Sequence, residues 1–464
     1  MIIFDYGWRA RVREGGESPR ILLTKGIKLG KYRPFVVSAF PPWRKSAKEG
    51  GRPEGKKGDL HQIFPGVKTQ KEVEEMRKMF VVLSAIALAA AFSVPAGAVE
   101  QKPIVWKMQS TWTAADNHQV GANGFAEKVN AMAGGRLKIE MSAAGAVVPA
   151  FEVLDAVHKG ILDGGHAWPG YWFGKHPAAT LFSSVAGGPF GMDNLDFLTW
   201  LYKGGGVKLY NELLQNELKM NVVAFPASGE TAEPQGWFKK PITDVKSFRG
   251  LKFRAAGAAA EVFKVLGMSV VILPGGEIVP ALQRGVIDAG EFSDPSADMK
   301  MGFQDVAKYY YNPGVHQPTG MMEILINKKK WDELTPDLKA IVEYAAMAEQ
   351  QAFDTHMIDQ NSKDMQILIS KHGVKVMETP REILLEVLKA WDKVAEKYVK
   401  ENAFFAKVYA SQKEFAARVV PYRRIAHPPY DLAADYYWGA ANPYQVTKAG
   451  KLPAAAPAKA PAKK

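Results

Sequence analysis

The chain has 464 residues, of which 47% are hydrophobic and 23% are charged, so it is long enough for two or three domains with buried cores. It contains no cysteine, which excludes disulfide frameworks, thiolate-bound zinc or iron–sulfur sites and cysteine nucleophiles. The formal net charge of +12 invites a nucleic-acid-binding interpretation, so the location of that charge matters.

The basic residues lie mostly near the two ends of the chain. Residues 1–78 contain 18 Lys and Arg against nine Asp and Glu, and residues 443–464 contain five Lys and no acid. The stretch between them is therefore slightly acidic. A duplex-binding surface needs Lys and Arg clustered on a folded face, and the sequence reveals no such cluster. We expect no nucleic-acid partner.

A secretory signal peptide is predicted at residues 76–98. The basic start MRKM precedes the apolar run FVVLSAIALAAAFSV, and Pro95 and the small residues AGA follow, as at a signal-peptidase site. The run is shorter than the roughly 20 apolar residues that a membrane span needs, which makes an uncleaved anchor the weaker alternative. We expect export to the periplasm and a mature chain that begins at Val99.

Residues 1–75 precede this signal, and they are rich in Gly, Pro and basic side chains without sustained periodicity. Either the start codon is assigned too early and Met76 is the true initiator, or a cytoplasmic extension precedes an anchor. We favour the first explanation and expect this segment to be disordered. The Ala/Pro/Lys-rich end, residues 443–464, is also expected to be disordered.

Strands and helices alternate through the body of the chain. In the first part, we expect strands at 104–108, 136–141 and 161–168 and helices at 117–133 and 151–160. After a helix near 194–216 and a strand at 220–226, we expect strands at 251–254, 270–272 and 286–289 and helices at 258–267 and 278–285. This alternation predicts an α/β fold with largely parallel sheets covered by helices.

A long helix is predicted to begin at Pro336, after Thr335 as N-cap, and to run to about Lys371. At about 1.5 Å per residue it is about 50 Å long, enough to cross a whole domain. A further helical region extends from about Pro380 to Val420. Two α/β units bound together by a long helix predict a two-lobed protein, and clefts between lobes are where small ligands bind.

Seven strings in the body resemble the solute-binding proteins of tripartite ATP-independent periplasmic (TRAP) transporters, most closely the subgroup that binds 2-oxo acids such as pyruvate. They are GGRLKIE (134–140), AGAVVPAFEVLDAVHKGILDGGHAW (144–168), YWFGKHPAA (171–179), GWFKKPI (236–242), GLKFRAAG (250–257), PALQRGVIDAGEF (280–292) and YYYNPG (309–314). The resemblance covers nearly all of 104–442.

This resemblance implies a two-lobed periplasmic binding protein fold with a ligand cleft between the lobes. Lobe 1 is expected at 99–223 with part of 316–371, and lobe 2 at 224–315, while 316–442 supply a crossover strand, the long helix and the C-terminal helices. The implied function is capture of a small organic acid for TRAP membrane subunits, without catalysis. Family members can also dimerise through their C-terminal helices, and the apolar content of 381–420 permits a homodimer here.

Arg254 is the strongest candidate for a ligand-binding residue. It lies at the C-terminal end of a predicted strand, where open α/β sheets present ligand contacts, and a guanidinium fork matches a carboxylate. Spacing alone would favour an arginine salt-bridged on the surface. The resemblance assigns the arginine of this string as the carboxylate clamp.

Two acidic residues are candidate metal ligands. In the related proteins a Glu-Trp pair follows a strand, and a metal is bound by the glutamate and by the backbone carbonyl of the next residue. Glu291 and Phe292 occupy these two positions here, with Phe in place of Trp. Glu233 stands where pyruvate-binding relatives carry a glutamine that ligates sodium. Two carboxylates favour a divalent, oxygen-liganded cation, so we expect calcium rather than sodium, with the bound acid completing the coordination. The alternative is that Glu233 is an exposed loop acid and Gln235 is the ligand.

Aromatic residues Trp112, Trp168, Tyr171 and Trp172 follow early strands, and the resemblance implies that such residues line the cleft; we favour Trp112 and Tyr171 as ligand contacts. His166 and His176 lack metal-ligand spacing and are expected to be structural. A function of another class, a secreted hydrolase or lyase that uses Glu233 and Glu291 as an acid/base pair, is the alternative. No nucleophile elbow or metalloprotease helix supports it.

Overall fold

The computed structural model describes residues 102–439 apart from residue 231, together with residues 71, 74, 75, 78 and 79 and the backbone of three strands near the N-terminus. The chain divides into two compact units, residues 1–97 and 98–464. In the first unit, β1 (Ile2–Phe4), β2 (Trp8–Arg13) and β3 (Arg20–Lys25) form an antiparallel sheet in that order.

These three strands lie within the segment 1–75, for which disorder was expected. The signal segment 76–98, apart from residues 78 and 79, and the tail 443–464 lie outside the described residues. The signal peptide, the early start codon and the two disordered ends therefore stay predictions. Among the described residues, no helix combines the length and the apolar character that a membrane crossing needs.

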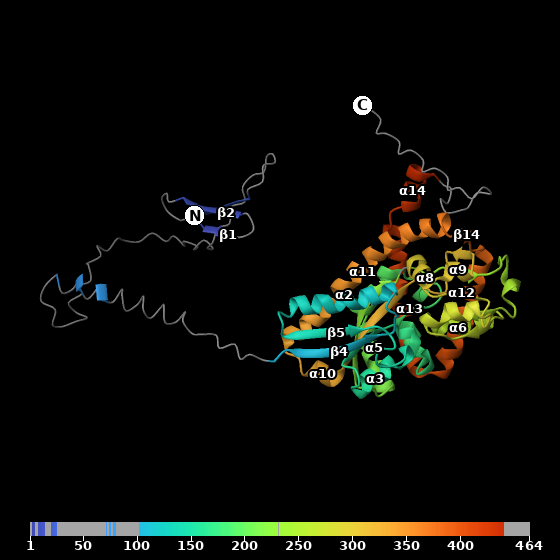
Figure 1. Cartoon of the computed structure of the whole chain (residues 1–464), viewed down its shortest axis with the longest axis horizontal. Coiled ribbons are helices and arrows are strands. Elements are labelled where there is room, and N and C mark those ends of the chain that lie inside the picture. The colour runs from blue at the N-terminus through green and yellow to red at the C-terminus, as the bar shows by residue number, and fades with distance from the viewer. Residues whose placement is uncertain are drawn as a thin grey trace, which may run out of the picture. The chain divides into compact units, whose positions relative to one another are not determined.

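Lobe 1 of the second unit is built on a five-stranded sheet in the order β5-β4-β6-β13-β7 (Figure 1). Its strands are β4 (Ile104–Ser110), β5 (Leu137–Ser142), β6 (Gly164–Ala167), β7 (Val222–Glu230) and β13 (Gly320–Asn327). The first three strands are parallel, as predicted, whereas β13 runs antiparallel to β6 and β7. The sheet is therefore mixed, because β13 enters it from the other lobe.

The helices of this lobe follow the predicted order. They are α2 (Asn117–Met132), α3 (Val153–Lys159), α4 (Asn194–Lys203), α5 (Gly206–Glu212) and α10 (Lys328–Asp332), with short helical turns η2 (Ala150–Glu152), η3 (Pro169–Gly174), η4 (Pro177–Phe182), η5 (Pro189–Gly191) and η6 (Leu213–Glu217). The single helix expected near 194–216 is interrupted where Gly205 takes a φ of 87°, a conformation that favours glycine.

Lobe 2 is built on a six-stranded sheet in the order β10-β9-β11-β8-β12-β14. Its strands are β8 (Gly236–Phe238), β9 (Lys252–Arg254), β10 (Ser269–Val271), β11 (Ala289–Gly290), β12 (Tyr309–Asn312) and β14 (Lys375–Glu378). β9 pairs in parallel with β10 and β11, and β8 runs antiparallel to β11 and β12. Its helical segments are α6 (Gly257–Val265), α7 (Gly275–Gln283), α8 (Pro295–Met301), α9 (Phe303–Val306) and η7 (Val245–Phe248).

Two segments cross between the sheets. Residues 231–235 connect β7 of lobe 1 to β8 of lobe 2, and residues 313–319 connect β12 of lobe 2 to β13 of lobe 1. The segments lie side by side, because the Glu233 amide donates to the Gln317 carbonyl at 3.0 Å and the Gly314 amide donates to the Glu233 carbonyl at 3.1 Å. The crossover pair is therefore a direct physical link between the lobes.

The predicted long helix is α11 (Pro336–Ser370), with Thr335 at the N-cap position. The Thr335 hydroxyl bonds the Asp337 carboxylate at 2.6 Å and makes no side-chain cap to the backbone. The helix contacts both lobes: Glu349 pairs with Lys128 of α2, and Asp364 accepts from the Ser296 hydroxyl of α8 at 2.5 Å. The expectation of a long helix that spans the lobes is confirmed.

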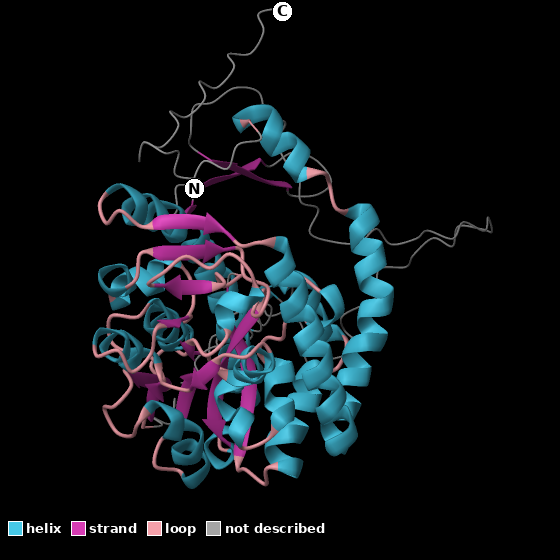
Figure 2. Ribbon diagram, turned by 90° about the vertical axis from the view of Figure 1, so that its right-hand side faces the viewer, coloured by secondary structure: helices cyan, strands magenta, loops and turns pink. Residues whose placement is uncertain are grey.

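The helical region expected at 380–420 consists of α12 (Arg381–Glu401) and α13 (Ala403–Ala426), followed by α14 (Tyr430–Trp438). Asn402 separates the first two helices, and its side chain caps α13 by accepting from the Phe405 amide at 2.7 Å. Figure 2 shows the strands flanked by helices. The largest fully buried side chains between these layers include Trp106, Trp172, Trp200 and Trp237.

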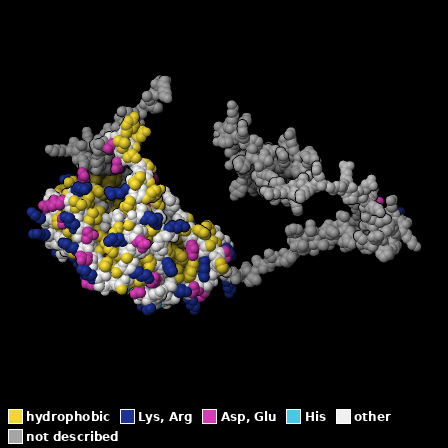
Figure 3. All heavy atoms as spheres, turned by 180° about the vertical axis from the view of Figure 1, so that it is seen from behind, with side chains coloured by type: hydrophobic (Ala, Val, Ile, Leu, Met, Phe, Trp, Pro, Cys, Tyr) yellow, Lys and Arg dark blue, Asp and Glu magenta, His cyan; other side chains and the backbone are white. Residues whose placement is uncertain are grey.

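The surface of the second unit mixes both signs of charge. On the face drawn in Figure 3, Lys and Arg alternate with Asp and Glu and form no continuous basic area. Apolar side chains gather on the projecting α14, where Tyr430, Leu432, Tyr436, Tyr437 and Trp438 are all more than 60% exposed.

Glu323 of β13 is an ionisable group in the core of lobe 1. Its two carboxylate oxygens accept from the Trp172 indole N–H and the Tyr210 hydroxyl, both at 2.6 Å. Burial raises the pKa of this carboxyl from 4.5 to about 7. The folded protein thus holds a proton that the unfolded chain releases between these pH values, so this group lowers the free energy of unfolding as pH rises from 4.5 to 7.

We expect Glu323→Gln to remove this pH dependence. Because one pKa unit corresponds to about 1.4 kcal/mol, the loss of unfolding free energy between about pH 5 and about pH 8 should shrink by about 2–3 kcal/mol. Urea unfolding followed by tryptophan fluorescence at both pH values measures it. Glu343→Gln on the exposed face of α11 is the matched control. An unchanged difference in Glu323→Gln would show that the carboxyl is already ionised at about pH 5.

Candidate functional site

A buried cavity lies where the two lobes and the crossover segments meet. Its volume is about 20 Å³, and it is lined by Trp112, His118, Trp168, Tyr171, Glu233, Arg254, Ala256, Glu291, Phe292, Gln317 and Met322. This volume is far below the roughly 300–1,000 Å³ of sites for drug-sized ligands. The site therefore suits only a small molecule, and the residues around it are already closely packed.

Three sources supply these residues. Lobe 1 contributes an aromatic wall, because the turns after β4 and β6 carry Trp112 and Tyr171. Lobe 2 contributes charged groups at the carboxyl ends of parallel strands β9 and β11, which is where open α/β sheets present ligand contacts. Glu233 and Gln317 come from the paired crossover segments.

Arg254 is the last residue of β9 and is 1% exposed, which excludes the alternative of a surface salt bridge. Its Nε donates to the Leu273 carbonyl at 3.0 Å, and its Nη1 donates to the backbone carbonyl and the carboxylate of Glu291 at 2.8 and 3.1 Å. No described residue accepts a hydrogen bond from Nη2. The side chain is thus fixed on one edge, while the other edge of the guanidinium keeps a donor for an incoming carboxylate.

Glu291 follows β11 directly and is also buried. Besides its contact with Arg254, its carboxylate accepts from the Ala256 amide at 3.1 Å. Burial raises the pKa of the Glu291 carboxyl, although the Arg254 charge, the Ala256 amide and a hydrogen bond with Glu233 oppose the rise. Desolvation is thus the dominant influence on this acid.

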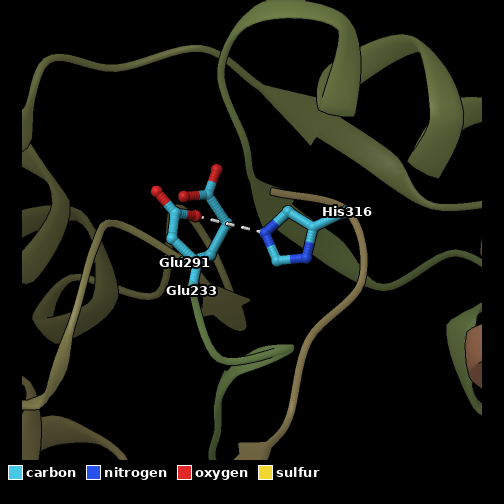
Figure 4. A group of neighbouring side chains, drawn as sticks. All are labelled: Glu233, Glu291 and His316. Atoms are coloured by element: carbon cyan, nitrogen blue, oxygen red, sulfur yellow. Dashed lines mark ion pairs between the residues drawn. The ribbon is translucent and has the colours of Figure 1, made fainter. Parts of the chain in front are cut away.

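Glu233 is 1% exposed, so the alternative of an exposed loop acid is wrong. Its Oε1 accepts from the Gln317 side-chain amide at 2.8 Å, and its Oε2 lies 3.3 Å from Nε2 of His316. Figure 4 shows the carboxyl groups of Glu233 and Glu291 side by side with the His316 imidazole directed toward them. Gln235, the alternative ligand, is buried but does not line the cavity.

These residues fit a metal ion. One ligand atom from each of Glu233, Glu291 and His316 lies within 4.8 Å of the other two, and all three side chains are buried. Burial, with the nearby Arg254 charge, lowers the pKa of His316 to about 3, which keeps the imidazole neutral. Two carboxylates beside one guanidinium leave an excess of negative charge, and a cation would compensate for it.

The aromatic wall of Trp112, Trp168 and Tyr171 is held in place by contacts between its rings and by one hydrogen bond. The Tyr171 ring centroid lies 5.8 Å from that of Trp112 and 5.3 Å from that of Trp168. The Trp112 indole N–H donates to Nδ1 of His166 at 2.8 Å. Burial lowers the pKa of His166 to about 3, so its proton lies on Nε2, which faces the Ser228 hydroxyl at 3.3 Å.

The structure brings together every residue that the sequence singled out as a substrate or metal ligand: Arg254, Glu233, Glu291, Phe292, Trp112 and Tyr171 all line this cavity. The Phe292 ring packs under the guanidinium, with Arg254 Cζ 5.6 Å from its centroid. Trp172 points away from the cavity to Glu323. His166 supports Trp112, and His176 accepts from the Ala178 amide at the start of η4, so both have structural contacts.

Sequence reasoning missed His118, Gln317, Met322 and His316. His118 is held by Asp116, whose carboxylate lies 2.9 Å from its Nδ1, and Ser293 of lobe 2 lies 3.4 Å from its Nε2. His316 and Gln317 follow the YYYNPG string after one residue, Val315, and lie outside any pattern that predicts a ligand. Only the pairing of the crossover segments brings them to Glu233.

Comparison with known proteins establishes the family. The model of the family described as bacterial extracellular solute-binding protein, family 7 (DctP), matches residues 108–402, well over half of the chain. The chain belongs to this family. A curated member, the monocarboxylate 2-oxoacid-binding periplasmic protein of Nostoc sp. (strain PCC 7120), is 34% identical over 330 residues, which are 71% of this chain and 89% of that protein.

Solved structures of TRAP solute-binding proteins have the same fold. The protein from Bordetella bronchiseptica, a dimer with copurified calcium and picolinate, is 28% identical with a TM-score of 0.67 and covers 72% of this chain and 97% of that one. The protein from Pseudoalteromonas atlantica, with sodium and pyruvate, is 29% identical with a TM-score of 0.66, covering 71% and 98%. The protein from Colwellia psychrerythraea, with calcium and pyruvate, is 27% identical with a TM-score of 0.66, covering 71% and 99%.

Family 7 members are extracellular solute receptors, so this chain is a binding protein and the hydrolase or lyase alternative is wrong. The two-lobed α/β fold expected from the sequence is confirmed by the same structures.

The hydrogen bond between Trp112 and His166 yields a prediction. His166→Leu removes the acceptor of the indole N–H, and a buried donor without a partner costs about 1–3 kcal/mol, so the indole should turn away from the cavity wall. We expect affinity for pyruvate, measured by calorimetry with calcium present, to fall about 10-fold. His166→Gln keeps an acceptor and should lose little. Equal losses in the two variants would contradict this role of the hydrogen bond.

Proposed function

We propose that the protein captures a small 2-oxo or 2-hydroxy monocarboxylic acid, together with a metal ion, and delivers it to the membrane subunits of a TRAP transporter. The observation that carries this proposal is Arg254, a buried guanidinium held on one edge by Glu291 and Leu273 and directed into a small cavity. A guanidinium binds a carboxylate through parallel hydrogen bonds and stays charged at physiological pH.

The rest of the cavity favours a monocarboxylate. Arg254 is the only Lys or Arg among the residues that line it, and the opposite wall consists of the aromatic rings of Trp112, Trp168 and Tyr171. A second carboxylate would lose its hydration without gaining a cationic partner, which is costly. A short apolar substituent instead packs against the rings. The Nostoc relative, named as binding monocarboxylate 2-oxoacids, supports the same class.

A cation completes the site. Glu233 and Glu291 provide carboxylate oxygens, and the backbone carbonyl of Phe292 is a further ligand by resemblance. The oxo or hydroxy oxygen and the carboxylate of the acid would bind the same ion. Two carboxylates favour calcium over sodium, because a divalent ion better balances the charge. Calcium accompanies the ligand in the Bordetella and Colwellia proteins, and sodium in the Pseudoalteromonas protein.

Arg254→Lys tests the carboxylate clamp. An ammonium cannot form the planar two-bond contact, so we expect affinity for pyruvate to fall about 10- to 100-fold with calcium present. Calorimetry of the full chain measures it. Arg249→Lys, at an exposed arginine, is the matched control and should bind as the unaltered protein does. An unchanged affinity in Arg254→Lys would refute the clamp.

The unaltered protein can be used to test whether a metal ion takes part in acid binding. If ion and acid share the site, each raises the affinity of the other by the same factor. Protein treated with a chelator should therefore gain little thermal stability from pyruvate, and calcium should restore the gain. Equally tight pyruvate binding with calcium and with excess chelator would exclude a metal role for Glu233.

Export and assembly follow from the same proposal. We propose that residues 76–98 act as a cleaved signal peptide with Met76 as the initiator, which the extracellular character of family 7 supports. N-terminal sequencing of the exported protein should begin at Val99, and an intact segment before residue 99 would refute it. A homodimer through the C-terminal helices is supported by the exposed aromatic residues of α14 and by the dimeric Bordetella relative.

A further inference from the structure

His316 is a buried histidine at the edge of the site, and the resemblance to TRAP proteins assigns it no role. It lies on the crossover segment 313–319, and its side chain is fully buried. Nε2 lies 3.3 Å from Glu233 Oε2, but neither ring nitrogen makes a hydrogen bond with a described residue. Buried polar atoms without partners are rare because each costs free energy. The ring is therefore placed as if for a partner that the chain itself does not supply.

The surroundings of the ring limit what that partner is. One side is closed by Phe263, whose ring centroid lies 5.2 Å from that of the imidazole. The other side faces the two carboxylates, and the ligand atoms of His316, Glu233 and Glu291 all lie within 4.8 Å of one another. Zinc holds nitrogen and oxygen ligands at about 2.0–2.2 Å, so two ligands of one ion lie at most about 4.4 Å apart. The three groups are therefore within a few tenths of an ångström of the separations that one ion requires, and small side-chain shifts let it contact all three.

We propose that His316 is a third protein ligand of the cation and that its nitrogen adapts the site to a first-row transition dication, such as zinc or manganese, in preference to calcium. Calcium takes oxygen ligands, whereas imidazole together with carboxylates suits the transition metals. Three protein ligands leave open positions, as in sites where a small molecule completes the coordination. This inference rests on the proposed function only in that the acid occupies those open positions.

The experiment uses the full chain freed of metal and adds no acid. Cobalt(II) is the probe, because its visible absorption reports the ligands around it. Competition of zinc with bound cobalt gives the affinity for zinc. We expect His316→Gln to weaken cobalt and zinc binding by about 100-fold or more, since loss of even an outer-shell partner costs about 10- to 100-fold. Calcium binding should persist, because the amide supplies an oxygen. His356→Gln, at an exposed histidine of α11, is the matched control.

Two results would overturn the inference. Unchanged cobalt affinity in His316→Gln would show that the ring is not a ligand. Parallel losses of cobalt and calcium would show that the ring only holds Glu233 in place. Thermal melting identifies a variant that fails to fold. In that case, pulsed electron paramagnetic resonance of one equivalent of manganese bound to the unaltered protein tests the proposal. An imidazole ligand gives a nitrogen hyperfine coupling, and absence of this coupling refutes the proposal.

The outcome is separable from that of the proposed function. Pyruvate binding with calcium, measured in parallel, tests the receptor role without reference to His316. If pyruvate binds and the affinity for cobalt does not depend on His316, the inference fails and the proposed function stands. If cobalt depends on His316 and no acid binds with any cation, the metal site stands and the function fails.

Discussion

Two carboxylates share a desolvated space with one guanidinium, and this imbalance of charge governs the arrangement of the whole cleft. Arg254 compensates for one of the two acids, Glu291, and is itself fixed by that contact. Arg254 is the only Lys or Arg among the residues that line the cavity, and Glu233 is held by the Gln317 side-chain amide. Buried charged groups are costly unless each has partners, so the pairing of these side chains decides how they are arranged.

The topology explains how such a group can be assembled. Arg254 and Glu291 follow adjacent parallel strands of lobe 2, which brings their side chains to the same edge of the sheet. Glu233 and Gln317 reach that edge because the two crossover segments pair with each other. α11 contacts both lobes and so links them at a second place besides the crossover segments.

The sequence predicts much of this and fails at identifiable places. Helices such as α2 and α11, and strands such as β5 with clear alternation, follow local rules. Local patterns also place Arg254 and Glu291 at strand ends. The antiparallel entry of β13 depends on a connection between sheets, which no local pattern encodes. His316 and Gln317 become ligand-site residues through a long-range backbone pairing. The short strands β8 and β12 are likewise set by their neighbours in the sheet, not by their own sequence.

The cavity is divided between an aromatic wall from lobe 1 and a charged floor from lobe 2 and the crossover segments. The wall residues Trp112 and Tyr171 lie in turns after β4 and β6, whereas Arg254 and Glu291 lie at the ends of paired strands. Connecting segments tolerate substitution more readily than paired strands do. The shape of the wall can therefore change by exchange of one ring for another while the charged groups keep their places.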